Sequence, residues 1–120
     1  MISLTMNGDS FGATARPGFG IDVVSTDRAT CTLNLGTKHL TLVISSGGVR
    51  AWGSGDCAAG AGSAVTKLPR GVPAQRSITW HRVLSSPGCK TAHTAARPGT
   101  YTAVAYDGSL HSQTLVFVLR

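Results

Sequence analysis

The sequence predicts an all-β domain, and three observations support this prediction. The 120-residue chain contains no Glu, three Lys and two Met, so the residues that favour helices are scarce. It is rich in residues that favour turns and strands, with 15 Gly, 14 Thr and 12 Ser. Short stretches in which apolar and polar residues alternate recur between turn signals along the whole chain.

The predicted strands are short and follow one another closely. Residues 39–46 form the longest apolar run, and Gly47 and Gly48 follow it where a tight hairpin turn requires positive φ. Asp107 and Gly108 give another tight-turn signal before the last strand. The seven expected strands are residues 2–6, 19–25, 39–46, 49–54, 77–83, 100–106 and 115–119. The expected irregular segments are a linker at 31–36, a Gly/Ala-rich loop at 53–62, a connection at 68–73 and a long loop at 84–98.

Two packed antiparallel sheets would bury the apolar faces of these strands. The sequence therefore predicts an immunoglobulin-like two-sheet antiparallel β-sandwich of about seven strands, in a single domain over residues 1–120. Tyr101 follows a Pro-Gly-Thr turn at the start of the sixth strand, where a tyrosine-corner hydroxyl ties down a loop in such sandwiches. The large side chains expected in the core are Phe19, Trp52, Trp80 and Phe117.

The charge of the chain is basic but dispersed. The net charge is +6 and the isoelectric point is near 9.9. The eight Arg residues are scattered, and no basic run or stacked aromatic motif accompanies them, so specific nucleic-acid binding is not expected. A basic surface of this kind favours loose association with anionic partners.

Neither a catalytic set nor a metal site is predicted. The block Gly8-Asp9-Ser10 resembles the opening motif of lipase-like hydrolases. Those hydrolases also have a later Asp-x-x-His motif, but here three residues rather than two separate Asp107 from His111, and helices are missing. We interpret the block as a turn. The four histidines have no metal-ligand spacing and no Glu partner, so no metal or other cofactor is expected; they are His39, His81, His93 and His111.

One segment around Trp52 offers a possible binding surface. Arg50 and Trp52 are two positions apart on a predicted strand, so they are expected to share a face. Either Trp52 lies in the core with Arg50 at its rim, or the pair forms an open surface for a ligand. Asp56 would raise rather than lower the thiol pKa of Cys57, so it is expected to cap a turn and not to activate a nucleophile.

The three cysteines, Cys31, Cys57 and Cys89, lie beside turn-forming residues, and no pair has the spacing of a zinc or thioredoxin-like motif. A small all-β domain with cysteines in loops is typical of an oxidising compartment. The odd number leaves one thiol over. Strand parity places the ends of the second and fourth strands at the same pole, which favours a pair between Cys31 and Cys57.

Several motifs together resemble one family. They are Cys31 with Leu35-Gly36, Ser45-Ser46-Gly47, Arg50-x-Trp52-x-Ser54-x-Asp56-Cys57, Leu68 with Gly71, Ile78-Thr79-Trp80, Ser86-Pro87-Gly88-Cys89, Pro98-Gly99-Thr100-Tyr101-Thr102 and Phe117-x-Leu119. Over nearly its whole length the chain resembles the C-terminal extracytoplasmic domain of uncharacterised envelope proteins of high-GC Gram-positive bacteria, mycobacteria included. More distantly it is similar to BsuPI-type proteinase-inhibitor domains.

The resemblance implies a location and a function. Proteins of that family have a cytoplasmic part, one membrane helix, a linker and then this domain, so we expect the chain to be excised from a longer protein anchored upstream of Ile2. The domain would lie on the extracytoplasmic face of the plasma membrane or in the cell wall. It would act as a non-catalytic binding or scaffolding module for an envelope protein or an anionic wall polymer. The alternatives are a proteinase-inhibitor-like module and a carbohydrate-binding sandwich, which would need exposed coplanar aromatic rings.

The resemblance also implies a disulfide arrangement. The family has a cysteine just before the first strand, which this chain lacks. In the family that cysteine is expected to meet Cys31, so that Cys57 would pair with Cys89 and Cys31 would be left over here. This pairing competes with the alternative of Cys31 with Cys57.

Overall fold

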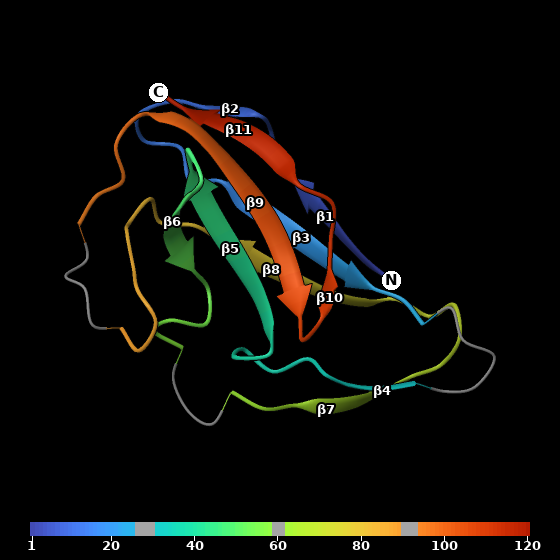
Figure 1. Ribbon diagram of the computed structural model, residues 1–120. Helices are drawn as coiled ribbons and strands as arrows, with labels where there is room; N and C mark the ends of the chain where they lie inside the picture. The colour runs from blue at the N-terminus through green and yellow to red at the C-terminus, as the bar shows by residue number, and fades with distance from the viewer. Residues whose placement is uncertain (26–30, 59–61, 90–93) are drawn as a thin grey trace.

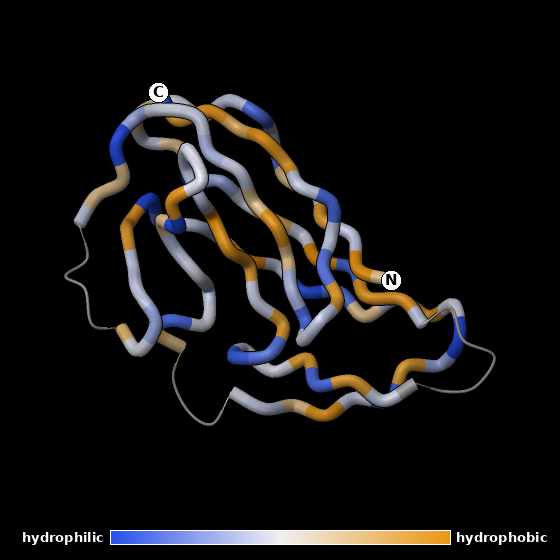
Figure 2. Tube along the Cα trace, viewed as in Figure 1, coloured by the Kyte–Doolittle hydropathy of each residue, from blue (hydrophilic) through white to orange (hydrophobic). Residues whose placement is uncertain are grey.

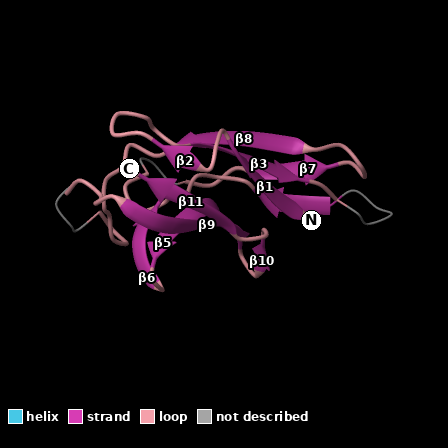
Figure 3. Ribbon diagram, turned by 90° about the horizontal axis from the view of Figure 1, so that it is seen from above, coloured by secondary structure: helices cyan, strands magenta, loops and turns pink. Residues whose placement is uncertain are grey.

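A computed structural model describes residues 1–25, 31–58, 62–89 and 94–120, and the described chain is built of strands and loops without helix. Two sheets lie in two layers, as Figures 1 and 3 show. The first sheet has the order β1 (Ile2–Met6), β3 (Gly18–Val23) and β8 (Ala74–Thr79). The second has the order β2 (Ser10–Phe11), β11 (Leu115–Leu119), β9 (Gly99–Asp107), β5 (Leu40–Ser46) and β6 (Val49–Gly53), and β10 (Leu110–His111) pairs with β9.

The arrangement confirms the predicted immunoglobulin-like sandwich. Strands are antiparallel within both sheets, except that β2 runs parallel to β11. The chain changes sheets between β1 and β2, so its first segment contributes to both layers. The limits of the first and last predicted strands, residues 2–6 and 115–119, agree with β1 and β11. The predicted strand 77–83 was wrong in its limits, because β8 covers Ala74–Thr79 and ends before Trp80. The described chain has eleven strands rather than about seven, because several pairings are only two to four residues long.

A two-stranded ribbon was missing from the predicted fold. It consists of β4 (Cys31–Asn34) and β7 (Val65–Leu68), which pair antiparallel and lie apart from the two sheets (Figure 1). Residues 31–36 had been expected to form a linker and residue 68 to begin an irregular connection. Leu35 and Leu68 are 4% and 2% exposed, so the ribbon is held by burial of a few side chains that short sequence patterns do not reveal.

The core lies between the inner faces of the two sheets, and apolar residues follow the strands that enclose it (Figure 2). Trp80 and Phe117 are fully buried, and their ring centroids are 6.0 Å apart in an edge-to-face arrangement. Phe19 contacts Phe117 in the same way at 5.6 Å. Full burial of each such ring stabilises the fold by roughly 2 to 3 kcal/mol. Trp52 is half-buried and packs on Trp80 at the margin of this cluster.

Tyr101 forms the predicted corner. Its side chain is 5% exposed and its hydroxyl donates a hydrogen bond of 2.6 Å to the backbone carbonyl of Arg97. The ring stacks on Phe117, with the centroids 5.8 Å apart. The loop before β9 is therefore tied to the core, as the position of Tyr101 had indicated.

Candidate functional site

A β-bulge in β6 separates the two residues that were expected to act together. Ile44 pairs with Trp52 and Ser45 with Arg50, so Ala51 is the extra residue between them. Ile44 faces the core, and Trp52 therefore faces inward, whereas Arg50 lies on the outer face. The expectation of a shared face was wrong because the bulge breaks the two-residue alternation on which it rested.

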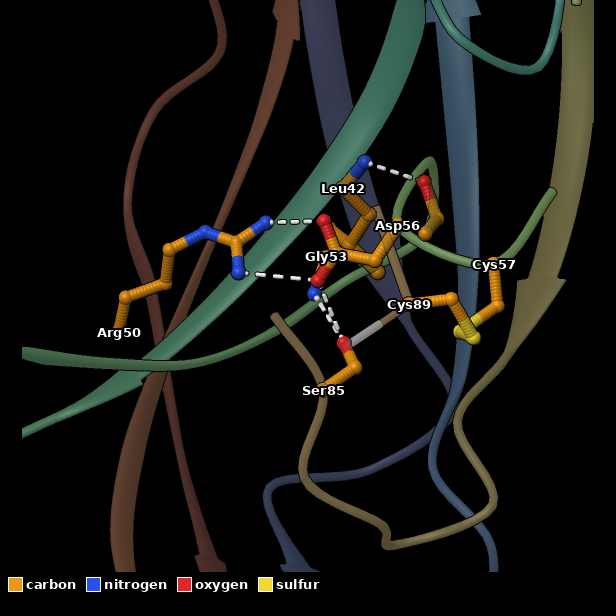
Figure 4. A network of polar contacts seen from close by, with 8 residues as sticks. Leu42, Arg50, Gly53, Asp56, Cys57, Ser85 and Cys89 are labelled. Carbon is orange, nitrogen blue, oxygen red and sulfur yellow. Dashed lines mark hydrogen bonds and ion pairs between the residues drawn. A yellow bond between two sulfur atoms is a disulfide. The ribbon is translucent and has the colours of Figure 1, made fainter. Parts of the chain in front are cut away.

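On the outer face, Arg50 joins a compact polar network with Asp56 and Ser85 (Figure 4). The Arg50 guanidinium donates two hydrogen bonds to the Asp56 carboxylate, at 2.9 and 2.6 Å, in a bidentate ion pair. The Ser85 hydroxyl donates to the same carboxylate at 2.5 Å. We call these three side chains, with the backbone of Gly53 that they enclose, the edge clamp.

The electrostatics of the clamp favour a charged carboxylate. Burial of Asp56, whose side chain is 6% exposed, acts to raise its pKa. Hydrogen bonds from Arg50 and Ser85, the charge of Arg50 and the Gly53 N–H together outweigh burial and lower the pKa below the ordinary value of 3.8. The expected role of Asp56 as a turn cap therefore covers only part of its function, because two of its partners are side chains.

The clamp attaches a distant loop to the edge of β6. The Ser85 N–H donates to the Ala51 carbonyl at 3.0 Å, and the Gly53 N–H donates to the Ser85 hydroxyl oxygen at 3.2 Å. A Cβ atom at Gly53 would collide with the Arg50 guanidinium, so a larger residue there would displace the end of the Arg50 side chain from the ion pair. Ser85 had not been predicted, because nothing in the sequence near residue 85 shows that it meets a hairpin about 30 positions earlier.

A disulfide between Cys57 and Cys89 closes the same junction (Figure 4). This confirms the pairing that the family resemblance implied and excludes the pair of Cys31 with Cys57. The disulfide joins the end of the β6 turn to the loop that carries Ser85, and the two cysteines are 32 positions apart in sequence. Cys31 begins β4, and its side chain lies outside the described part of the structure.

A cleft opens on the inner side of this edge, between β6 and β8. Its volume is about 300 Å³, and its lining is mostly apolar. Leu40, Trp52 and Ile78 lie along it, and Arg76 contributes the charge among its lining residues. Arg76 pairs with Ile21, a fully buried residue, so its side chain starts on the inner face of β8 and emerges at the open rim. The alternation of residues 74, 76, 78 and 80 could have revealed this placement.

The residues weighed for catalysis are dispersed. Ser10 is the partner of Val118, which in turn pairs with Thr100 near the start of β9, whereas Asp107 is the last residue of that strand. Seven residues of extended chain, about 23 Å, separate these positions. The hydrolase-like motif is therefore not assembled in the fold.

The histidines do not form a cluster in the described structure either. His39, His81 and His111 are exposed at separate positions, and His93 lies outside the described residues. Within the described ranges, no three His, Cys, Asp or Glu side chains gather as metal ligands would. Burial raises the pKa of Asp107, and the nearby charge of His39 partly opposes this rise.

The described ranges include no helix long and apolar enough to cross a bilayer. No protein-family model matches the sequence, and a search of curated proteins gives no match. Among solved structures, 98% of the chain aligns with a β-glucosidase from Erythrobacter marinus, with a TM-score of 0.57 and 14% sequence identity. The chain spans 15% of the length of that protein, and at this identity the likeness shows the fold alone.

Proposed function

We propose that this domain is a non-catalytic binding module of the cell envelope, and that the cleft between β6 and β8 is its binding site. The cleft supports the proposal because it is where apolar lining and a positive charge meet at an open edge. Arg50, by contrast, is already neutralised by Asp56 in the edge clamp. A ligand with an apolar part and a negative charge would complement Trp52, Ile78 and Arg76.

The net charge of the chain supports an anionic partner. A charge of +6 attracts anionic proteins and polymers and raises the rate at which they reach the domain. Two candidate partners carry the negative charge that such a domain attracts: an envelope protein with an acidic segment, and an anionic wall polymer. A carbohydrate-binding surface is less well supported, because among the seven aromatic side chains, all of them described, Tyr106 alone is exposed.

The proposed location is the extracytoplasmic side of the membrane. The disulfide between Cys57 and Cys89 is compatible with an oxidising compartment. The family resemblance adds the proposal of an anchor upstream of the domain.

Site-specific photo-crosslinking in the cells that produce the protein tests this function. A photoreactive residue at Ser77, which is exposed on β8 beside the cleft, is expected to give an adduct with an envelope component. The same group at Val116, which is 54% exposed on the outer face of the other sheet, serves as the control. Equal adduct yields from the two positions would contradict a binding site at the cleft.

A further inference from the structure

The edges of the two sheets are protected unequally. At the edge of β1, the side-chain amide of Gln113 takes the place of a neighbouring strand: it accepts the Leu4 N–H at 3.2 Å and donates to the Leu4 carbonyl at 2.7 Å. At the edge of β6, Ser85 bonds to Ala51 and Gly53. β2 is an edge strand of only two residues. Covered or very short edges do not readily accept another strand.

β8 is the exception among the described edges of the two sheets that form the sandwich. It has six residues, pairs with β3 alone, and four of its residues are exposed. The Trp80 N–H donates to the Pro17 carbonyl at 2.9 Å, and this bond fixes the alternation along the antiparallel pair. The N–H and C=O groups of Arg76 and Ile78 therefore point to β3, and those of Ser77 and Thr79 point to the open edge.

We propose that β8 binds an extended, acidic segment of a partner protein, which adds to the first sheet as a further strand. This inference rests on the proposed binding function and specifies its partner. The backbone groups of Ser77 and Thr79 would pair with the added strand, as in other cases of strand addition. These main-chain bonds would supply affinity without regard to sequence.

The side chains beside the edge would supply specificity. Alternate residues of the added strand would point to the inner face and lie over the cleft. Apolar residues there would contact Trp52 and Ile78, and an acidic residue would lie near Arg76. The Arg76 guanidinium now donates a 2.8 Å bond to the Gln75 carbonyl, which belongs to the open edge. A carboxylate on the partner would draw the guanidinium away from that carbonyl and free it for pairing.

A second copy of the chain is a poorer occupant of this edge. An antiparallel pair of β8 strands related by a two-fold axis at Arg76 or Ser77 would bring the two Arg76 side chains opposite or diagonal to each other. It would also join two molecules that each carry a charge of +6. Repulsion between the two Arg76 side chains and between the two positively charged molecules therefore favours an acidic partner over a second copy.

Binding of synthetic peptides to the oxidised domain tests the inference. The probe is a panel of peptides about as long as β8 in which Glu alternates with Leu, Val or Phe. Two controls carry Lys in place of Glu, or N-methyl groups on alternate backbone nitrogens. The acidic peptides are expected to shift the NMR signals of the Ser77 and Thr79 amides. The Lys and N-methyl controls are each expected to bind about tenfold more weakly or not at all.

Two pairs of protein variants locate the contact. Ser77→Pro removes an N–H that points to the open edge and not to β3, so the sheet should persist while peptide affinity falls about tenfold relative to Ser77→Ala. Arg76→Gln is expected to weaken the acidic peptides about threefold at low salt, and Arg97→Gln, at an exposed residue before β9, is expected to have no effect.

Several outcomes would overturn the inference. The first is that none of the acidic peptides binds at millimolar concentration. The second is that Ser77→Pro binds the acidic peptides as tightly as Ser77→Ala does, or that N-methyl peptides bind as well as the unmethylated ones. The third is self-association of the domain through β8. The N-methyl comparison uses the unmodified protein, so it decides even where a variant does not fold. Crosslinks from Ser77 to a wall polymer rather than to a polypeptide would support the binding module but exclude strand addition.

Discussion

Removal of the Asp56 carboxylate tests the edge clamp, which attaches the loop of Ser85 to the edge of β6. The Asp56→Ala substitution removes the carboxylate that accepts two hydrogen bonds from Arg50 and one from Ser85. The Arg50 side chain is 36% exposed and is hydrated again, so its ion pair contributes about 1 kcal/mol. The half-buried bond from Ser85 contributes about 1 kcal/mol more. The expected loss is therefore about 2 kcal/mol, or a fall in Tm of about 8 °C.

Urea unfolding of a double-mutant cycle measures the ion pair separately. The single variants Arg50→Ala and Asp56→Ala, with the double variant, are expected to give a coupling energy of about 1 kcal/mol at pH 7. Asp9→Ala, which removes an exposed carboxylate outside the clamp, is expected to change stability by less than about 0.5 kcal/mol. A coupling energy indistinguishable from zero would refute the clamp.

The dependence of the coupling on pH provides a second check. The pKa of Asp56 is lowered in the folded chain, so the carboxylate contributes its full stabilisation above the unfolded value of 3.8. This contribution is lost as the pH falls from 3.8 through the lowered pKa. A coupling that disappeared already between pH 7 and pH 5 would contradict this assignment.

Three further predictions concern the sandwich itself. Tyr101→Phe removes the hydrogen bond to Arg97, so thermal unfolding should show a loss of about 1 kcal/mol; an unchanged Tm would reject the corner. Reduction of the disulfide between Cys57 and Cys89 should cost about 3 to 4 kcal/mol in urea, the chain-entropy value for a loop of 32 residues, and no loss would count against its structural role. Burial raises the pKa of Asp107, so ionisation of this carboxyl destabilises the fold as pH rises through that pKa. Asp107→Asn should therefore raise Tm at pH 7 and leave it nearly unchanged at pH 3. A larger gain in Tm at pH 3 than at pH 7 would contradict a raised pKa.

Local patterns predicted the parts of the fold that local chemistry determines. The alternation of residues 2–6 and 115–119 matches the buried faces of β1 and β11. Gly47 and Gly48 adopt φ values of +59° and +80°, as a tight hairpin turn requires. These features depend on neighbours in the chain, so a single sequence is enough to find them.

The parts that the sequence did not predict depend on distant contacts. The bulge at Ala51 turns Arg50 away from Trp52, and no residue type in the segment predicts a bulge there. Ser85 meets Asp56 only because a loop folds against the edge of β6. The sequence therefore predicted Arg50 and Asp56 of the edge clamp and Trp52 of the cleft, but not their arrangement.

Amide hydrogen exchange of the oxidised domain tests the central claim that β8 is an open edge ready to bind a partner. The amides of Ser77 and Thr79 are expected to exchange rapidly, while that of Ile78 on the same strand and that of Gly53 in the edge clamp are protected. If Ser77 and Thr79 were protected as strongly as Ile78, the edge would already be covered within the chain and the proposed binding site would not exist.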